Sequence, residues 1–183
     1  MHLTGGQFKG RIIQTPKGEK TNVRPTLSKV RESVFNILFS HFGDFSSLSF
    51  LDMFTGSGIM ALEAYSRGFK NINAVEFDLK TFSAAKKTFA AFNADIKLIK
   101  GDALKITPKL EKFDVIYIDP PWEFDYEPVI KTALDKLTHD GVMVIEYDKK
   151  SAAENAKKAK SQNEILPFKQ KTYGRTNIDF YSL

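Results

Sequence analysis

The residues best suited to chemistry form the turn Asp119-Pro120-Pro121-Trp122, which follows the apolar run 113–118. Neither proline can donate a backbone hydrogen bond, so a strand must end here, and a residue before proline is held extended. The Asp119 carboxylate and the Pro120 carbonyl can therefore accept both N–H groups of an exocyclic amine. This would aim the nitrogen lone pair at a methyl group carried by a cofactor, and both acceptors would stabilise the positive charge that develops on nitrogen. Trp122 can stack on the base that carries the amine.

A second chemical signal is the turn at 51–58, Leu-Asp-Met-Phe-Thr-Gly-Ser-Gly, between an apolar run and a helical pattern. Gly56 and Gly58 allow positive φ and remove Cβ atoms that would block a ligand. The amides at a helix start can bind an anionic group such as a cofactor carboxylate. The same spacing, with Ala61, also fits a nicotinamide dinucleotide site or a purely structural turn. It predicts an adenosine-containing cofactor without identifying which one.

Two acids end later predicted strands. Glu76 lies 18 residues after Gly58, where a carboxylate can accept the hydroxyls of a ribose, and Asp102 ends the next strand, where it could accept from an adenine amine. The residues that we assign to the cofactor are Asp52, Phe54, Gly56, Ser57, Gly58, Glu76, Phe77, Asp102 and Ala103.

The elements that must position these turns alternate between strand and helix patterns. We expect strands at 48–54, 72–75, 96–99, 113–118, 141–147, 165–172 and 178–183. We expect helices from Leu27, capped by Thr26, and at 59–67, 79–92, 126–137 and 151–160. Repeated βα units imply a mainly parallel sheet with helices on both faces, closed by an antiparallel pair of strands at the C-terminal edge.

Composition excludes several kinds of protein. No apolar run approaches the roughly 20 residues that span a bilayer, and the start lacks the apolar stretch of a signal peptide, so we expect a cytoplasmic protein. There is no cysteine, and the three histidines are scattered, so we expect no metal site. Nothing in the sequence suggests more than a monomer.

The positive charge is concentrated at the N-terminus. Residues 1–31 carry seven basic residues and one acid, a net of +6, whereas the rest of the chain carries −1. This asymmetry suggests a polyanionic partner, although a solvated basic surface remains an alternative.

Taken together, these motifs resemble the amino-group methyltransferases with an Asp/Asn-Pro-Pro-aromatic turn, and most closely the 16S rRNA (guanine-N2)-methyltransferases of the D type. The resemblance covers nearly the whole chain. Besides the two turns, it rests on Gly5-Gly6-Gln7-Phe8-Lys9-Gly10-Arg11, on Arg24-Pro25-Thr26, on the segments 30–38 and 62–68, and on Tyr173-Gly174-Arg175. One departure is Trp122, which stands where that family usually has Tyr or Phe.

The resemblance implies a Rossmann-like class I methyltransferase domain at 43–183, preceded by a basic RNA-binding arm and helix at 1–42. It further implies S-adenosyl-L-methionine as methyl donor and a guanine of 16S rRNA, naked or in the small subunit, as acceptor. The catalytic residues would be Asp119, Pro120, Pro121 and Trp122. The RNA contacts would be Lys9, Arg11, Arg24, Arg31 and Arg175.

Four other functions share parts of this pattern. DNA adenine-N6 and protein glutamine-N5 methyltransferases share the Asp119 turn. A nicotinamide-dependent dehydrogenase shares the glycine turn but needs a substrate domain for which the chain has no room. A non-catalytic RNA-binding module would explain the basic arm but not the acids at the strand ends.

Overall fold

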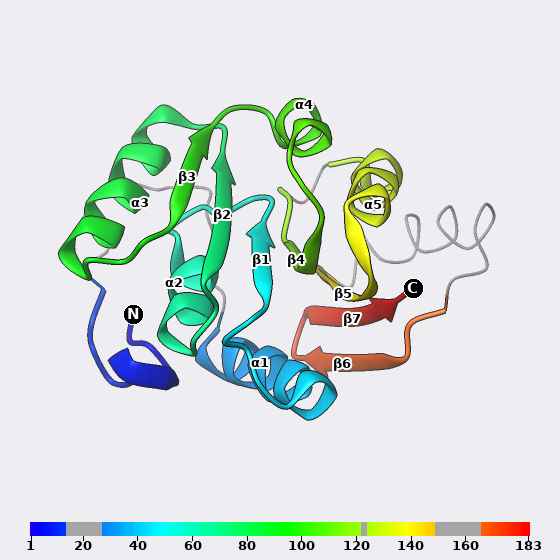
Figure 1. The fold of residues 1–183 in the computed structure, drawn as a ribbon, viewed down its shortest axis with the longest axis horizontal. Helices are drawn as coiled ribbons and strands as arrows, with labels where there is room; N and C mark the ends of the chain where they lie inside the picture. Colours follow the sequence, from blue (N-terminus) through cyan, green and yellow to red (C-terminus); the bar gives the residue numbers. More distant parts are fainter. Residues whose placement is uncertain (14–26, 122–123, 149–165) are drawn as a thin grey trace.

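The computed structural model describes residues 1–13, 27–121, 124–148 and 166–183. These residues form one sheet with helices packed on it (Figure 1). Its strands are β1 Ser49–Asp52, β2 Asn71–Glu76, β3 Lys97–Lys100, β4 Phe113–Ile118, β5 Leu137–Asp148, β6 Lys169–Tyr173 and β7 Thr176–Ser182. Their order across the sheet is β3-β2-β1-β4-β5-β7-β6. Neighbours among β1 to β5 pair in parallel, and β7 runs antiparallel to β5 and β6. The prediction of a mainly parallel sheet with an antiparallel edge is confirmed.

Helices cover both faces of this sheet. They are α1 Ser28–Phe42, α2 Ile59–Ser66, α3 Leu79–Ala91, α4 Ala103–Ile106 and α5 Tyr126–Asp135, with 3₁₀ turns η1 Gly6–Phe8 and η2 Thr107–Lys109. On β4, Val115 and Tyr117 join the core shared with α1, α2 and α3. The alternating Ile116 and Ile118 join the core shared with α4 and α5. Because β4 is buried on both faces, its sequence is apolar apart from Asp114, whose carboxylate accepts hydrogen bonds from Ser49. None of the helices in the described ranges is long and apolar enough to cross a membrane.

The N-terminal segment 1–13 folds back on itself as a short loop. Leu3 and Arg11 are joined by a backbone hydrogen bond of 3.0 Å, and Ile13 donates to the Met1 carbonyl at 2.7 Å. Leu3 and Ile13 are buried in the same cluster as Phe50 of β1. The loop, α1 and the sheet therefore share one core, and the division of the chain at residue 42 into arm and catalytic domain stays a prediction.

Several element boundaries differ from the sequence prediction. Helix α1 begins at Ser28, one residue later than expected, and Leu27 occupies its N-cap position without a side-chain cap. Thr26, the expected cap, lies outside the described residues. Strand β5 begins at Leu137, where a helix was expected to continue, because its register against β4 shifts between Phe113 and Val115. The short α4 was not anticipated, since four residues give too little periodicity. The helix expected at 151–160 lies outside the described residues.

Candidate active site

The acids predicted to bind ligands gather at one edge of the sheet. Asp52 is the last residue of β1, Glu76 is the last of β2, and Asp119 follows β4 directly. β1 pairs in parallel with both β2 and β4, so the carboxyl ends of these strands are neighbours. The strand order reverses between β1 and β4, and open α/β sheets bind ligands at such a switch point.

The glycine turn between β1 and α2 is held by the neighbouring strand. The Gly56 amide donates to Glu76 Oε2 at 2.9 Å, and the Thr55 amide donates to the Val75 carbonyl at 2.9 Å. Gly58 has φ 80°, and a Cβ there would lie 2.6 Å from the ring of Phe89 on α3. Gly58 is therefore required for the packing of α2 on α3, in addition to any ligand that approaches the turn.

Asp52 is a buried acid with an unsatisfied oxygen. Its Oδ2 accepts from Thr55 Oγ1 at 2.8 Å, whereas no donor in the described part of the chain meets hydrogen-bond geometry for Oδ1. Burial raises the pKa of Asp52 to about 7, with a smaller contribution from repulsion by Glu76. An oxygen of this kind marks a place where a ligand can donate a hydrogen bond.

Glu76 is oriented by two backbone amides. Its Oε1 accepts from the Asp78 amide at 2.7 Å and its Oε2 from Gly56. Partial burial raises the pKa of Glu76, and these amides oppose that shift. A carboxylate has about four lone-pair sites, so two remain for a ligand such as a ribose diol. The next residue, Phe77, has a side chain that is 72% exposed. A planar ligand could therefore stack on the Phe77 ring.

The remaining cofactor candidates have structural contacts of their own. Asp102 caps α4, because its Oδ1 accepts from the Leu104 amide at 3.0 Å, and Lys105 Nζ lies 3.8 Å from its Oδ2. Ala103 is buried in the core beneath α4. Phe54 is half-buried and meets the Phe124 ring edge-on, with 5.4 Å between centroids. Their assignments to the cofactor stay predictions, as does that of Ser57.

The turn after β4 combines a buried and an exposed proline. Pro120 is buried and Pro121 exposed, and the Pro121 carbonyl accepts from the Phe124 amide at 2.9 Å. Asp119 is half-buried beside Pro120. Trp122, the expected stacking residue, lies outside the described residues.

Three residues near Asp119 were missed by the sequence analysis. Tyr117 of β4 donates a short hydrogen bond from its hydroxyl to the buried Glu146 carboxylate of β5. The hydroxyl of Tyr126, on α5, is buried and has no partner within the described ranges. Burial, followed by the nearby acids Glu146 and Asp119, raises the pKa of both tyrosines, so they stay neutral donors. The one available signal was Glu146 itself, an acid at the end of the apolar run 142–145.

The whole chain matches one family of known proteins. The model described as Conserved hypothetical protein 95 matches residues 1–182. The chain belongs to this family. YlbH of Bacillus subtilis (strain 168), named as a candidate rRNA methyltransferase, is 30% identical over 190 residues, which are 99% of this chain and 98% of that protein. The ribosomal RNA small subunit methyltransferase D of Buchnera aphidicola is 28% identical over 170 residues, 91% of this chain and 82% of that one.

A solved structure confirms the fold. An Escherichia coli protein described as a candidate methyltransferase, yhhF, has a TM-score of 0.81 and 24% identity, covering 99% of this chain and 96% of that chain. A Pyrococcus horikoshii protein described as a candidate RNA methyltransferase has a TM-score of 0.70 and 16% identity, covering 92% of this chain and 91% of that chain. The Rossmann-like class I methyltransferase fold expected from the sequence is therefore confirmed.

The glycines in the family-like opening Gly5-Gly6 are explained by close packing on α2. A Cβ on Gly6, which has φ 72°, would lie 1.8 Å from the Ser66 carbonyl oxygen, and one on Gly5 would lie 2.3 Å from the Arg67 guanidinium. Ser66 Oγ donates to the Gly5 carbonyl at 2.6 Å and accepts from the Phe8 amide at 2.9 Å. These opening residues therefore pack the N-terminal loop against the C-terminal end of α2.

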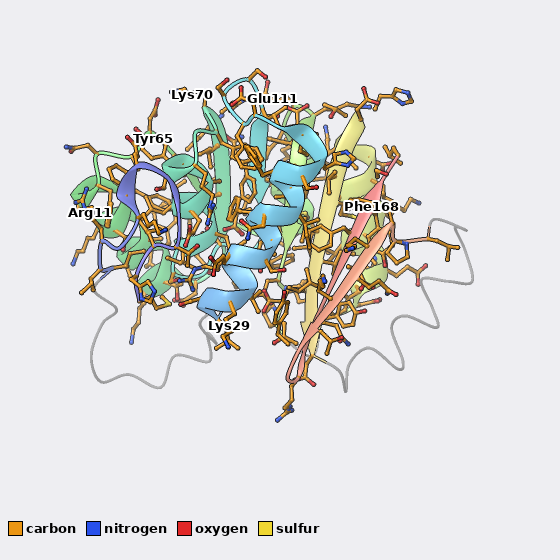
Figure 2. All side chains as sticks on the ribbon, turned by 90° about the horizontal axis from the view of Figure 1, so that it is seen from below. Arg11, Lys29, Tyr65, Lys70, Glu111 and Phe168 are labelled. Atoms are coloured by element: carbon orange, nitrogen blue, oxygen red, sulfur yellow. The ribbon has the colours of Figure 1, made fainter. Side chains whose placement is uncertain are left out.

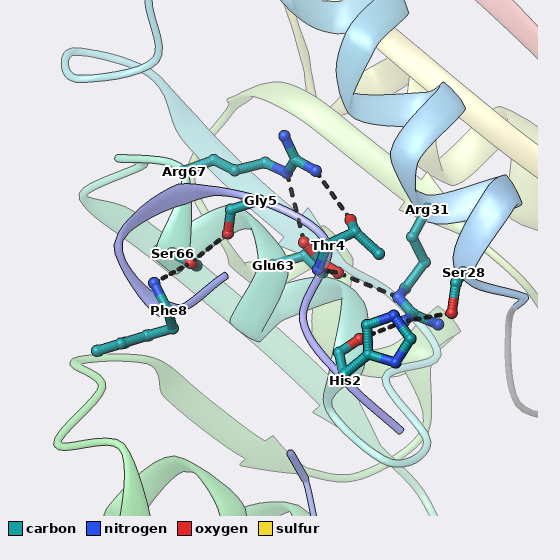
Figure 3. A network of polar contacts seen from close by, with 9 residues as sticks. All are labelled: His2, Thr4, Gly5, Phe8, Ser28, Arg31, Glu63, Ser66 and Arg67. Carbon is teal, nitrogen blue, oxygen red and sulfur yellow. Dashed lines mark hydrogen bonds and ion pairs between the residues drawn. The ribbon is translucent and has the colours of Figure 1, made fainter. Parts of the chain in front are cut away.

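Arg31 corrects one of the expected RNA contacts. Its side chain is 1% exposed, and its Nε lies 3.2 Å from Oε1 of the fully buried Glu63 (Figure 3). Its Nη2 donates to the His2 carbonyl at 2.7 Å. Glu63 also accepts from the Thr4 amide at 2.7 Å and lies 3.4 Å from Arg67 Nε. A phosphate cannot reach Arg31 in this arrangement, so its role here is to join the N-terminal loop, α1 and α2.

The other basic candidates remain at the surface. Lys9 and Arg11 are exposed, and the Arg11 guanidinium lies 4.1 Å from the Phe92 ring centroid. Arg175 is exposed in the β6–β7 turn and pairs with Asp148 at 3.3 Å. Arg24 lies outside the described residues. The assignment of these residues to RNA binding stays a prediction.

Proposed function

We propose that this protein transfers a methyl group from S-adenosylmethionine to the exocyclic N2 of a guanine in 16S rRNA. Two observations of different kinds support the proposal. The relatives of the chain carry the names of rRNA methyltransferases, one of them of the small subunit. The chain itself has the turn that an amine acceptor requires, at the ligand-binding edge of the sheet.

The observation that carries the proposal is the position of the Asp119-Pro120 turn. It follows β4, whose neighbour β1 ends in Asp52 and the glycine turn. The Asp119 carboxylate and the Pro120 carbonyl are acceptors, and an exocyclic amine offers two N–H donors. Acceptors on both donors fix the orientation of the nitrogen and gain strength as it becomes positive. After transfer, the proton that nitrogen loses can pass to an Asp119 carboxylate oxygen and from there to water.

The residues at this edge suit the proposed cofactor. Glu76 has lone pairs left for the two hydroxyls of a ribose, and the exposed Phe77 ring offers a face to a purine. The unsatisfied Oδ1 of Asp52 offers an acceptor to a cationic ligand, which would also favour the ionised form of this acid. When bound, S-adenosylmethionine supplies the electrophilic methyl group.

The test is methyl transfer to a defined acceptor. Small ribosomal subunits and their naked 16S rRNA, both from cells that lack this protein, are incubated with methyl-tritiated S-adenosylmethionine and the purified protein. We expect label in RNA that digests to N2-methylguanosine. The Asp119→Ala variant serves as the inactive control, and Asp140→Ala, an exposed acid on β5, as the matched active one. Label in DNA adenine or protein glutamine instead of RNA would show that a different amine is the substrate.

A further inference from the structure

A groove lies between α1 and β6, away from the residues that we assign to the cofactor. It encloses about 700 Å³ and is bordered by side chains from both elements. The α1 side contributes Lys29, Glu32, Ser33, Asn36, Ile37, Ser40 and His41, and the strand side contributes Phe168, Lys169 and Tyr173. Figure 2 shows α1 lying along the β6–β7 hairpin, with Lys29 and Phe168 at opposite ends.

One end of this groove opens at the catalytic edge of the sheet, by which we mean the edge formed by the carboxyl ends of β1, β2 and β4. Tyr173 is the last residue of β6 and pairs with Thr176, which also pairs with Asp148 at the carboxyl end of β5. β5 is parallel to β4, so this end of β5 lies on the same edge as the turn after β4. From there the groove follows α1 from Lys29 to His41, a length of about 18 Å at 1.5 Å per residue. A few nucleotides of a single strand fit this length.

The charge of the groove favours a polyanion. Lys29 and Lys169 border it, and Lys171 lies between Lys169 and Tyr173 on the same face of β6, because side chains alternate along a strand. All three lysines are exposed. Among the described residues that border the groove, Glu32 is the single acid.

The groove also offers flat rings. Phe168 is 44% exposed, and its ring stacks on that of His41 with 5.4 Å between centroids and 28° between planes. Tyr173 stands half-buried at the opposite end. A basic groove with aromatic side chains along it is the arrangement by which proteins hold single-stranded nucleic acid, since phosphates meet the cations and bases stack on the rings.

We propose that this groove binds the single-stranded RNA next to the target guanine and leads it to the catalytic edge. The inference rests on RNA being the substrate, as proposed above. The strand would enter along Phe168 and His41, and Tyr173 and Lys29 would hold the nucleotides nearest the flipped base. A flipped base needs its neighbours held, because flipping costs stacking and pairing energy.

The groove is tested by binding of a fluorescein-labelled oligouridylate, which contains no guanine and so reports on the groove apart from the reacting base. The variant is Lys169→Glu with Lys171→Glu. The matched control is Lys97→Glu with Lys112→Glu, two exposed lysines that do not border the groove, one on β3 and one just before β4, which make the same change in charge. Phe168→Ala removes the stacking ring without any change in charge. Thermal melting confirms that each variant is folded.

We expect the groove variant to bind at least 10-fold more weakly at low salt. The slope of log affinity against log salt should become shallower by about 1.4, for two phosphates at about 0.7 each. Phe168→Ala should weaken binding on the order of 10-fold, a loss in the range for one base stack, with the salt slope unchanged. The control variant should bind within threefold of the unmodified protein.

Equal losses in the groove variant and its control would overturn the inference, because binding would then depend on total charge alone. Undiminished binding by the groove variant would overturn it too, and would leave the groove to a protein partner. Methyl transfer to 16S rRNA by the unmodified protein, measured in parallel, separates these results from a failure of the proposed function. That failure would appear as no label in RNA whatever the groove variants do.

Discussion

Replacing Arg31 by Met should destabilise the protein strongly, although Arg31 is far from the proposed chemistry in sequence. The change leaves Glu63, which is 0% exposed, with the Arg67 guanidinium at 3.4 Å as its one ion-pair partner in the described part of the chain. It also removes the hydrogen bonds from the Arg31 guanidinium to the His2 carbonyl and Ser28 Oγ, at 2.7 and 3.3 Å. Breaking one side of a buried ion pair costs about 3–5 kcal/mol.

Because Arg67 and the Thr4 amide still face Glu63, we expect the lower end of this range, about 3 kcal/mol. For a domain of this size that corresponds to a fall of roughly 6–12 °C in Tm. The measurement is thermal unfolding followed by circular dichroism. Lys29→Met is the matched control, because Lys29 is an exposed cation two residues earlier on the same helix, and its loss should change stability by less than about 0.5 kcal/mol.

A second variant separates the ion pair from other effects of the substitution. In Arg31→Met with Glu63→Met, no buried charge is left without a partner, so the double variant should lose less stability than the sum of the two single variants. The opposite pattern would refute the reasoning: an unchanged Tm in Arg31→Met together with weaker RNA binding would return Arg31 to the role of a phosphate contact.

Three further predictions concern the catalytic edge. Asp119→Ala should lower kcat on the order of 10²–10³-fold in the tritium-transfer assay while cofactor affinity changes far less, and wild-type turnover would remove Asp119 from the mechanism. Glu76→Ala should weaken S-adenosylmethionine binding by about 1.5–3 kcal/mol in calorimetry, and an unchanged Kd would refute its assignment. The pKa of Asp52 is raised to about 7 from 3.8, so the folded state binds the extra proton, and stability should fall as pH rises from about 4 to about 7. Asp52→Asn should remove this slope in chemical denaturation and be more stable above pH 7; a slope that persists would show that another group is responsible.

The sequence predicted the strand ends well because each one is marked locally. Asp119 follows an apolar run that two prolines must end, and Glu76 follows the short predicted strand 72–75, so both positions followed from neighbouring residues. Because β1, β2 and β4 pair in parallel, their carboxyl ends lie at the same edge of the sheet, so the sequence also predicted that these acids lie close together. The same local reasoning predicted the order of the longer elements. It missed the four-residue helix α4 and misplaced boundaries such as the start of β5, where the register against β4 shifts.

Contacts between distant segments could not be predicted in this way. The bond from Tyr117 to Glu146 joins two strands, and the pair Arg31–Glu63 joins two helices. Neither leaves a periodic signal, because each depends on which faces meet after folding. Gly58 shows the same limit: its spacing indicated a ligand turn, whereas the ring of Phe89 that requires its missing Cβ lies on another helix.

The basic N-terminus shows why a charge count needs a structure before it indicates a binding surface. Among its cations in the described residues, Arg31 is buried in an ion pair with Glu63, whereas Lys9, Arg11 and Lys29 are exposed. Deleting the whole segment cannot test RNA binding, because Leu3 belongs to the core and its removal would unfold more than the loop. Charge reversal at Lys9 and Arg11, which leaves the docked loop its buried contacts, is the change that separates an RNA-binding surface from a solvated one.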